Sequence, residues 1–516
     1  MGIHDFGMYD LICRNARIYK DKPAWLEVEK NQTLTFAELK IEVDRLAQAL
    51  QTAGFQKGER IGIVGKNCLG YFLLYGAAAA LGGIAVPVNW RLSVEEAAYN
   101  LNDTQPRWVF VESEDPQWIT ALQKQMAPET FFHNLQPGQG PLAEMPLTDI
   151  PVESFAPNPV GSDDGFVIIH TAAVAGRPRG ALLSHHNLLC TNMHLINCFA
   201  MTARDVHLNI LPMYHVAGLC MTLQSFHAGS LNINVPKFEV SQALQLIAEH
   251  GVSLIFEFPP ILKSILDAQA QSQADIHSLR TVIGLDEPET IQRYEQATGG
   301  SYFTMYGQTE TSLLASLGRF QDCPGAAGRP IALASVQVVD DADRPVECGQ
   351  VGEIVMQGPM VFKGYWGLEE ETAFTFRNGW HHTGDMGRLD SDGFLWFTGR
   401  KADKELIKPG GENVYPAEVE MAILQHPAVQ AAVVFGVPDP KWKEGIKAVC
   451  SLKPGQTLTS KELIAFVGGR IARYKKPQYV DFAPELPTTA DGAIDRQKVK
   501  EIYGGNQPAP NKNSLA

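Results

Sequence analysis

The sequence predicts an α/β protein in which a large N-terminal domain of helix-covered parallel sheets carries a small β subdomain and precedes a small α+β C-terminal domain. Three observations lead to this prediction. Helical and strand patterns alternate along most of the first 400 residues, as they do in parallel sheets covered by helices. Short strand patterns between Gly, Asp and Pro turns replace them over residues 330–400. At 516 residues, the chain is also longer than one hydrophobic core usually serves.

The first clear helix–strand pair begins at Thr35. Thr35 and Glu38 form a capping box, the apolar residues that follow recur at helical spacing, and Gly54 is a typical helix end. Residues 60–64 (RIGIV) then predict a short buried strand. Residues 71–88 form the most apolar segment, but their Gly and Pro interruptions favour a buried helix followed by a strand. A membrane span would need ~20 apolar residues.

The later elements follow the same logic. A helical pattern over residues 241–250 precedes a strand pattern over 252–258. The strands expected in the β subdomain are short: 336–339, 353–357 and 394–398. The C-terminal unit is predicted as a helix, two strands and a helix: 417–425, 431–437, 448–452 and 460–471.

Composition excludes several classes of protein. A net charge of −14 argues against a general nucleic-acid binder, which needs a basic face. The eight cysteines form no CxxC pair, so neither a zinc site nor a disulfide framework is indicated. The N-terminus lacks the apolar run of a signal peptide, and no transmembrane segment is expected, so we expect a cytoplasmic protein. The sequence leaves open whether it forms a homodimer.

Residues 171–180 (TAAVAGRPRG) form a loop of small residues between two apolar strand patterns. Such a loop can present backbone N–H groups to an anion such as phosphate. A plain tight turn is an equally good interpretation of this segment when it is taken alone.

A second motif, Tyr306-Gly307-Gln308-Thr309-Glu310, combines three useful groups. The Tyr306 ring offers a flat face for adenine, and Thr309 offers a hydroxyl for a phosphate or an acyl carbonyl. Glu310 supplies a hard oxygen ligand of the kind that Mg²⁺ prefers. Taken alone, the motif could be a turn between strands.

A third stretch places a carboxylate, Asp385, ahead of an arginine, Arg400, and a glycine pair, Gly410 and Gly411. A carboxylate and an arginine can bind a ribose and a nearby phosphate. Paired glycines let the backbone approach a ligand closely. Surface ion pairs are the alternative interpretation of the two charged residues.

In this order, the motifs resemble those of the acyl-adenylate-forming ligases, which include acyl-CoA synthetases, peptide-synthetase adenylation domains and luciferases. The resemblance spans nearly the whole chain and implies ATP, Mg²⁺ and coenzyme A as ligands and a small-molecule carboxylic acid as substrate. It implies nucleotide-binding or CoA-binding roles for Thr171, Gly176, Arg179, Gly180, Gly284, Tyr306, Gly307, Thr309, Asp385, Arg400, Lys404, Gly410, Gly411 and Lys475. It also implies metal-binding roles for Glu310 and Thr171, and catalytic roles for Thr309, Glu310 and His215.

Two motifs depart from the family pattern. In the phosphate loop, the central hydroxyl-bearing residues are replaced by Ala172, Val174 and Ala175, so phosphate binding there is expected to rely on backbone amides, Thr171 and arginines. At the C-terminal motif, the family's adenylation lysine is replaced by Ala493 within otherwise matching residues. A single small residue in an intact motif favours an introduced Lys→Ala change over drift. The resemblance therefore implies impaired adenylation.

The resemblance also suggests domain boundaries. We expect a large domain over residues 1–400 (β subdomain 330–400), a hinge over 401–404, a mobile small domain over 405–503 and a disordered tail over 504–516. Lys404 is the expected pivot of the hinge, with Asp403 as the competing assignment.

The expected function is an ATP-dependent carboxylic acid–CoA ligase that works through an acyl-adenylate. The residues expected around the acid are mostly apolar, which favours an aliphatic (fatty) or aromatic monocarboxylate: His215, 227–229, Phe258, Gly284, Leu285 and Met305. Asp286 is the one candidate partner for an amino-acid ammonium group. Two alternatives stay open: an adenylating enzyme that loads a carrier-protein thiol, and a non-catalytic nucleotide- or acyl-binding protein.

Overall fold

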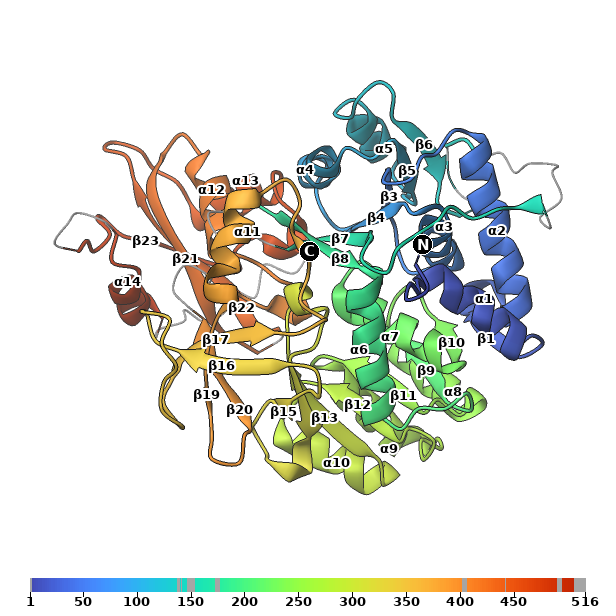
Figure 1. Cartoon of the computed structure of the whole chain (residues 1–516). Helices are drawn as coiled ribbons and strands as arrows, with labels where there is room; N and C mark the ends of the chain where they lie inside the picture. Colours follow the sequence, from blue (N-terminus) through green and yellow to red (C-terminus); the bar gives the residue numbers. More distant parts are fainter. Residues whose placement is uncertain are drawn as a thin grey trace. The chain divides into compact units, whose positions relative to one another are not determined.

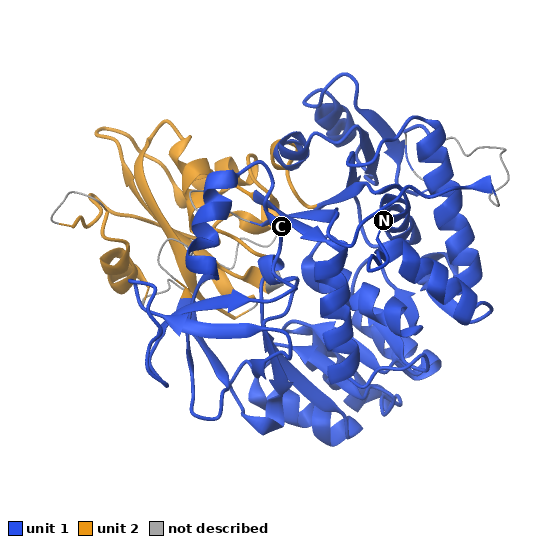
Figure 2. Cartoon of the chain, viewed as in Figure 1, with its two compact units in different colours: residues 1–90, 97–171, 179–399 blue, residues 91–96, 172–178, 400–516 orange. Residues whose placement is uncertain are grey.

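The computed structural model of the chain describes residues 2–136, 140, 142–145, 154–171, 177–400, 406–440, 442–489 and 494–504. The chain divides into two compact units (Figures 1 and 2). Unit 1 comprises Met1–Trp90, Ala97–Thr171 and Arg179–Gly399, and unit 2 comprises Arg91–Glu96, Ala172–Pro178 and Arg400–Ala516. Each unit is described by itself.

The first sheet of unit 1 has seven described strands and a parallel centre. The strands, in their order across the sheet, are β18 (Gly364–Tyr365), β8 (Arg179–Ser184), β7 (Gly165–Thr171), β4 (Ile84–Val88), β3 (Arg60–Val64), β5 (Trp108–Val111) and β6 (Phe131–Asn134). Strands β7, β4, β3, β5 and β6 pair in parallel, whereas β8 pairs antiparallel with both β7 and β18.

The second sheet of unit 1 has nine described strands. In order, they are β15 (Arg329–Pro330), β14 (Ser316–Arg319), β13 (Ser301–Tyr306), β12 (Thr281–Gly284), β11 (Leu254–Glu257), β9 (Val206–Asn209), β10 (Leu231–Asn234), β1 (Pro23–Glu27) and β2 (Gln32–Thr35). The run from β13 to β1 is parallel, and antiparallel strands lie at both ends. The predicted parallel sheets are confirmed.

Helices lie beside these sheets, and most of them contribute to one large hydrophobic core. They are α1 (Met8–Ile18), α2 (Phe36–Thr52), α3 (Leu69–Leu81), α4 (Val94–Thr104), α5 (Pro116–Gln123), α6 (His185–Cys198), α7 (Val216–Ala228), α8 (Val240–His250), α9 (Ile261–Ser272), α10 (Pro288–Thr298) and α11 (Glu369–Thr375). The capping box predicted at Thr35 is present, since its Oγ1 accepts from the Glu38 N–H and the Glu38 carboxylate accepts from the Thr35 N–H. The segment predicted as a buried helix and strand forms α3 and β4, and nearly all of its side chains are buried. Within the described residues, no helix combines the length and the apolarity that a membrane crossing requires.

A four-stranded sheet completes the described part of unit 1, in the order β16 (Ser335–Val339), β17 (Gly352–Gln357), β19 (His381–Leu389) and β20 (Leu395–Arg400). Three of these strands lie where the sequence predicted them. Strand β19 was not predicted, because its sequence (HHTGDMGRL) contains two glycines and an aspartate that interrupt any strand pattern. It nevertheless pairs with β17, and its register is interrupted by a bulge.

Unit 2 is a compact α+β structure. Its sheet contains β21 (Val429–Asp439), β22 (Lys443–Leu452) and β23 (Tyr479–Phe482), and its helices are α12 (Pro416–Leu424), α13 (Ser460–Gly468) and α14 (Arg496–Tyr503). The predicted order of elements is confirmed. Strands β21 and β22 are longer than predicted because they form one long antiparallel ladder. Helix α13 is shorter than predicted because it ends at the glycine pair Gly468 and Gly469.

Candidate functional site

Tyr306 and Asp385, which are 79 residues apart, meet in unit 1. Tyr306 ends β13, and its hydroxyl donates to Asp385 Oδ2 at 2.8 Å. The side-chain amide of Gln308 donates to the same oxygen at 2.6 Å and to the Thr383 carbonyl at 3.0 Å. Asp385 is only 2% exposed. The carboxylate that the sequence singled out is therefore oriented by two polar side chains of the Tyr306 motif, of which Gln308 was not predicted.

The backbone around Tyr306 requires glycine. A Cβ on Gly307 would lie 1.8 Å from the Leu313 carbonyl oxygen, so any side chain would displace the loop. The loop continues into the 3₁₀ turn η4 (Thr309–Thr311), which places Thr309 in a half-buried position. This close approach explains the glycine in the motif.

Glu310 and Thr171, the two predicted metal ligands, also lie together. Glu310 Oε1 accepts from the Tyr365 hydroxyl at 2.8 Å and from Thr171 Oγ1 at 3.4 Å. Thr171 ends β7, and Glu310 is 8% exposed. A buried carboxylate beside a hydroxyl is a set of hard oxygen donors, which fits Mg²⁺. The assignment of a metal to these residues stays a prediction.

Arg179 joins this group through Tyr365. Its guanidinium lies 4.0 Å from the centre of the Tyr365 ring, and its Nη2 donates to the Tyr365 hydroxyl at 3.1 Å. The neighbouring Gly180 is packed tightly, since a Cβ there would lie 2.6 Å from Ile168 Cγ2. Tyr365 was missed by sequence reasoning. Its only signal was its position after Gly364, which did not suggest a contact with Glu310.

Gly284 ends β12 beside the end of β11, at the same edge of the nine-stranded sheet as Tyr306. A Cβ on Gly284 would lie 2.3 Å from the Glu257 carbonyl oxygen. Glu257 itself is fully buried, and its Oε1 accepts from the Tyr302 hydroxyl at 2.7 Å. This buried carboxyl group departs from the apolar surroundings expected for the acid, and Leu285 beside it is 46% exposed.

His215 is the N-cap of α7 and is half-buried, with its ring 4.6 Å from the Tyr214 ring. His227 lies in the last turn of the same helix, about 18 Å away along its axis. Burial lowers the pKa of His227 to about 4. Gly229, at the C-cap, faces the ring of Tyr19, which a Cβ would approach within 2.2 Å. These two ends of α7 therefore lie far apart along the helix, and their grouping around one acid stays a prediction.

In unit 2, Gly410 lies in the turn η8 (Pro409–Gly411) with a φ of +60°. A Cβ there would lie 2.8 Å from a ring carbon of Trp442, so glycine is needed both for the backbone conformation and for this packing. The backbone of Gly411 completes the turn.

Lys475 lies in η9 (Arg473–Lys475) and is buried between two carboxylates of unit 2, those of Glu418 and Glu96. Its Nζ donates to Glu96 Oε1 at 2.6 Å and to Glu418 Oε1. In this arrangement, the Lys475 ammonium group, which the sequence assigned to ligand binding, is bound to both carboxylates. The proposed ligand would have to compete with them.

This cluster gives a testable pH dependence. Burial raises the pKa of Glu418 to about 7, while the Lys475 ammonium acts in the opposite direction. A carboxyl group with a raised pKa contributes stability that is present below its ordinary pKa, near 4.5, and is lost as the pH rises through 7. We expect Glu418→Gln to raise the Tm relative to the unsubstituted chain by at least about 2 °C at pH 8 and to leave it nearly unchanged at pH 5. Differential scanning calorimetry would measure this, with the exposed Glu485→Gln as the matched control; equal shifts at both pH values would contradict it.

Of the remaining predicted site residues, the structure describes Arg400 but not Gly176, Lys404 or Ala493. Arg400 is the last residue of β20 and is half-buried. Gly176, Lys404 and Ala493 lie outside the described residues, as does the expected hinge over 401–404. Their roles stay predictions.

Comparisons with known proteins agree with one another. The family model described as AMP-binding enzyme matches residues 12–366, and the model described as AMP-binding enzyme C-terminal domain matches residues 418–493. The chain is 33% identical to a feruloyl-CoA synthase from an Amycolatopsis species over 479 residues (91% of this chain and 94% of that protein). It is 33% identical to an indoleacetate–CoA ligase from Aromatoleum aromaticum over 498 residues (95% and 97%). A crystal structure named as a long-chain-fatty-acid CoA ligase from Rhodopseudomonas palustris superposes with a TM-score of 0.73 at 40% identity, covering 77% of this chain and all of that one.

Proposed function

Because the chain belongs to the AMP-binding enzyme family and is an AMP-forming acid–thiol ligase, we propose that it joins an aromatic or aliphatic monocarboxylic acid to coenzyme A through an acyl-adenylate. The observation that carries the proposal is the pair of adjoining clusters in unit 1. Tyr306 and Gln308 hold Asp385, and two residues further along the chain Glu310 meets Thr171. One cluster is suited to a nucleoside and the other to its phosphates.

In the first step, Asp385 accepts hydrogen bonds from the ribose hydroxyls of ATP, while the Tyr306 ring faces the adenine. Arg179 and the backbone amides of its loop offset the negative charge of the phosphates. Glu310 and Thr171 would hold Mg²⁺, which neutralises phosphate charge when it is bound. A carboxylate oxygen of the acid attacks the α-phosphorus, the bond to the β-phosphate oxygen breaks, and pyrophosphate leaves. The Thr309 hydroxyl is proposed to donate to the new acyl-adenylate.

In the second step, the thiolate of CoA attacks the acyl carbon, and AMP leaves with the electron pair of the broken C–O bond. We propose that unit 2 turns about Lys404 between the steps, so that Gly410 and Gly411 replace the Ala493 segment at the reacting centre. His215 is proposed to control passage between acid and thiol. Domain rotation of this kind allows one small domain to serve two steps.

The proposed acid rests on two supports. The relatives named above act on feruloyl and indoleacetate groups, which are aromatic monocarboxylates. Phe258 and Met305, which the sequence placed near the acid, are apolar and partly buried against the core. An aromatic acid with a short side chain is therefore our first choice, and a fatty acid is the second.

The test uses a supplied acyl-adenylate, because this bypasses the adenylation step. Indoleacetyl-AMP, feruloyl-AMP and a fatty acyl-AMP would each be incubated with the full-length protein and either CoA or a carrier protein that bears a pantetheine thiol. The thioester and AMP would be quantified by liquid chromatography. We expect thioester formation that depends on the protein, fastest with an aromatic acyl group. Transfer only to the pantetheine thiol of a carrier protein would replace CoA as the acceptor, and no transfer to either thiol would overturn the proposal.

Tyr365 supplies a second test, of the metal site. Replacing Tyr365 with phenylalanine removes the hydroxyl that donates to Glu310 and accepts from Arg179. Because partners of metal ligands typically contribute about 10–100-fold to metal affinity, we expect the Mg²⁺ concentration needed for half-maximal ATP binding to rise at least about tenfold. Isothermal titration calorimetry of ATP at increasing Mg²⁺ would measure it. Tyr503→Phe, in unit 2, is the matched control, and an unchanged Mg²⁺ requirement in Tyr365→Phe would contradict the assignment.

A further inference from the structure

Asp385 projects from a bulge in β19. Glu353 of β17 faces Met386, and Val355 faces His382, so the single residue Ile354 lies opposite the three residues 383–385. Bulges beside active sites re-aim a side chain and leave backbone groups without ladder partners. The direction of the Asp385 side chain therefore depends on whatever stabilises this bulge.

Two side chains stabilise the bulge. Thr383 Oγ1 donates to the Ile354 carbonyl at 2.6 Å and accepts from the Asp385 N–H at 3.1 Å. Glu353 Oε1 accepts from the N–H of Gly384 at 2.9 Å, and Gly384 adopts a φ of +69°. Glu353 is 4% exposed, so this bond is shielded from water. Its carboxylate replaces the ladder partner that the bulge removes.

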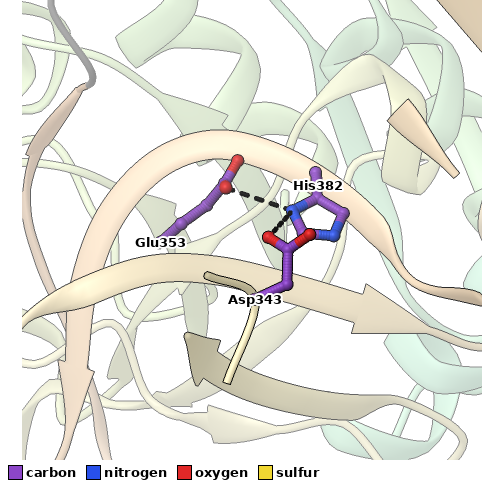
Figure 3. Close-up of side chains that lie close together, drawn as sticks. All are labelled: Asp343, Glu353 and His382. Atoms are coloured by element: carbon purple, nitrogen blue, oxygen red, sulfur yellow. Dashed lines mark hydrogen bonds and ion pairs between the residues drawn. The ribbon is translucent and has the colours of Figure 1, made fainter. Parts of the chain in front are cut away.

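The same carboxylate belongs to a cluster with the half-buried Asp343 and the buried His382, shown in Figure 3. His382 Nδ1 lies 3.1 Å from Glu353 Oε2 and 3.8 Å from Asp343 Oδ1. Two carboxylates and an imidazole could hold a metal ion, but a cation is already present. Arg377 Nη2 donates to Glu353 Oε2 at 3.2 Å, and its Nε and Nη2 donate to the two oxygens of Asp343 at 3.0 and 3.2 Å. The cluster is therefore centred on a guanidinium.

We propose that Glu353, held by Arg377, is a positioning residue for Asp385 and thereby sets the affinity of the enzyme for the ribose of ATP. One oxygen of Glu353 is used by Arg377 and His382, and the other by Gly384. The two oxygens of Glu353 therefore connect the bulge at Gly384 to Arg377, which is itself bound by Asp343 in the turn between β16 and β17. The inference rests on the proposed ribose-binding role of Asp385.

Glu353→Gln tests this role with little change in side-chain size. In Glu353→Gln, an amide NH₂ group replaces one oxygen and faces either the Gly384 N–H or the guanidinium. One of the two bonds is then lost with little change in volume. A buried N–H that loses its acceptor, or a bulge that loses its fixed support, shifts toward other conformations. We expect ATP affinity to fall about tenfold, less than when Asp385 itself is removed, because Tyr306 and Gln308 still hold that carboxylate.

The readout compares ATP with 2′,3′-dideoxy-ATP, which lacks the hydroxyls that Asp385 would bind. Dissociation constants for both nucleotides would be measured by isothermal titration calorimetry with Mg²⁺. In the unsubstituted protein, ATP should bind more tightly. In Glu353→Gln, the ATP constant should rise while the dideoxy-ATP constant stays within about twofold, so that the ratio falls. A role in folding alone would weaken both nucleotides equally or lower only the Tm.

Controls separate the possible failures. Glu347→Gln makes the same change at an exposed glutamate before β17 and should preserve the ratio. Asp385→Ala should bind ATP and dideoxy-ATP with equal affinity. If it still prefers ATP, the ribose assignment of the proposed function fails. If Asp385→Ala loses the preference for ATP and Glu353→Gln keeps it, the positioning role of Glu353 fails while the proposed function stands.

If Glu353→Gln does not fold, Arg377→Lys replaces it in the test. This substitution keeps the charge but loses the forked contact with Asp343 and Glu353. An unchanged ratio of the two dissociation constants in that variant overturns the proposal.

Discussion

Replacing Ala493 with lysine should raise the rate of acid-dependent pyrophosphate exchange by about 10²–10³-fold, the usual effect of one preorganised group at a transition state. The resemblance of the C-terminal motif implies that a lysine at this position bridges the carboxylate of the acid and the α-phosphate oxygens, whereas alanine carries no charge. Under the proposed function, the negative charge that develops on the α-phosphate is then offset by Arg179 and the backbone amides of its loop. Exchange of labelled pyrophosphate into ATP, with indoleacetate or ferulate as the acid, would measure the gain.

Two further measurements define the result. Ala493→Met adds length without charge and should leave exchange close to that of the unsubstituted chain. Thioester formation from a supplied acyl-adenylate should be equal in the unsubstituted chain and in Ala493→Lys, since we propose that Gly410 and Gly411 act in that step. Equal gains in both half-reactions would contradict the division of labour. ATP binding without any exchange in Ala493→Lys would instead favour a non-catalytic nucleotide-binding protein.

Replacing Asp385 with alanine should weaken ATP binding by at least about 100-fold. Two hydrogen bonds from ribose hydroxyls to a charged group contribute about 1.5–3 kcal/mol each, and the substitution also leaves the Tyr306 hydroxyl and the Gln308 amide without their shared acceptor. Calorimetric titration with ATP and Mg²⁺ would measure the loss.

The control for this prediction is Asp392→Ala, which removes an exposed carboxylate from the turn before β20 and should not change ATP affinity. Asp385→Asn should give an intermediate loss, because an amide oxygen still accepts but carries no charge. An Asp385→Ala protein that binds ATP as tightly as the unsubstituted chain would contradict a role of this cluster in nucleoside binding.

Much of the fold could be read from local patterns. The capping box at Thr35, the apolar segment that became α3 and β4, and the alternation of helices and strands depend on neighbouring residues alone. Strand β19 could not be predicted in this way, because its glycines and aspartate oppose strand formation locally. Its pairing with β17 and the support of its bulge by Glu353 outweigh that local preference.

The candidate site shows the same division. Its motifs were found because each is a short run of residues whose chemistry is visible together, as in Tyr306 to Glu310. Gln308, Tyr365 and Glu353 were missed, because each acts on a residue distant in sequence and none belongs to a run with its partner. Tyr365 is 55 residues from Glu310, for example, and the two residues meet because β18 pairs with β8 and the Phe362 N–H donates to the Glu310 carbonyl.

By itself, the sequence determined the fold class, the order of the elements and the chemical groups available for ATP, metal and thiol. These follow from periodicity, from turn-forming residues and from the side chains themselves, which are local properties of the chain. Only the tertiary structure decided which groups meet: Tyr306 and Gln308 on Asp385, Tyr365 between Arg179 and Glu310, and Glu353 under the bulge. Such contacts arise from strand register and close packing between distant segments, and no single segment encodes them.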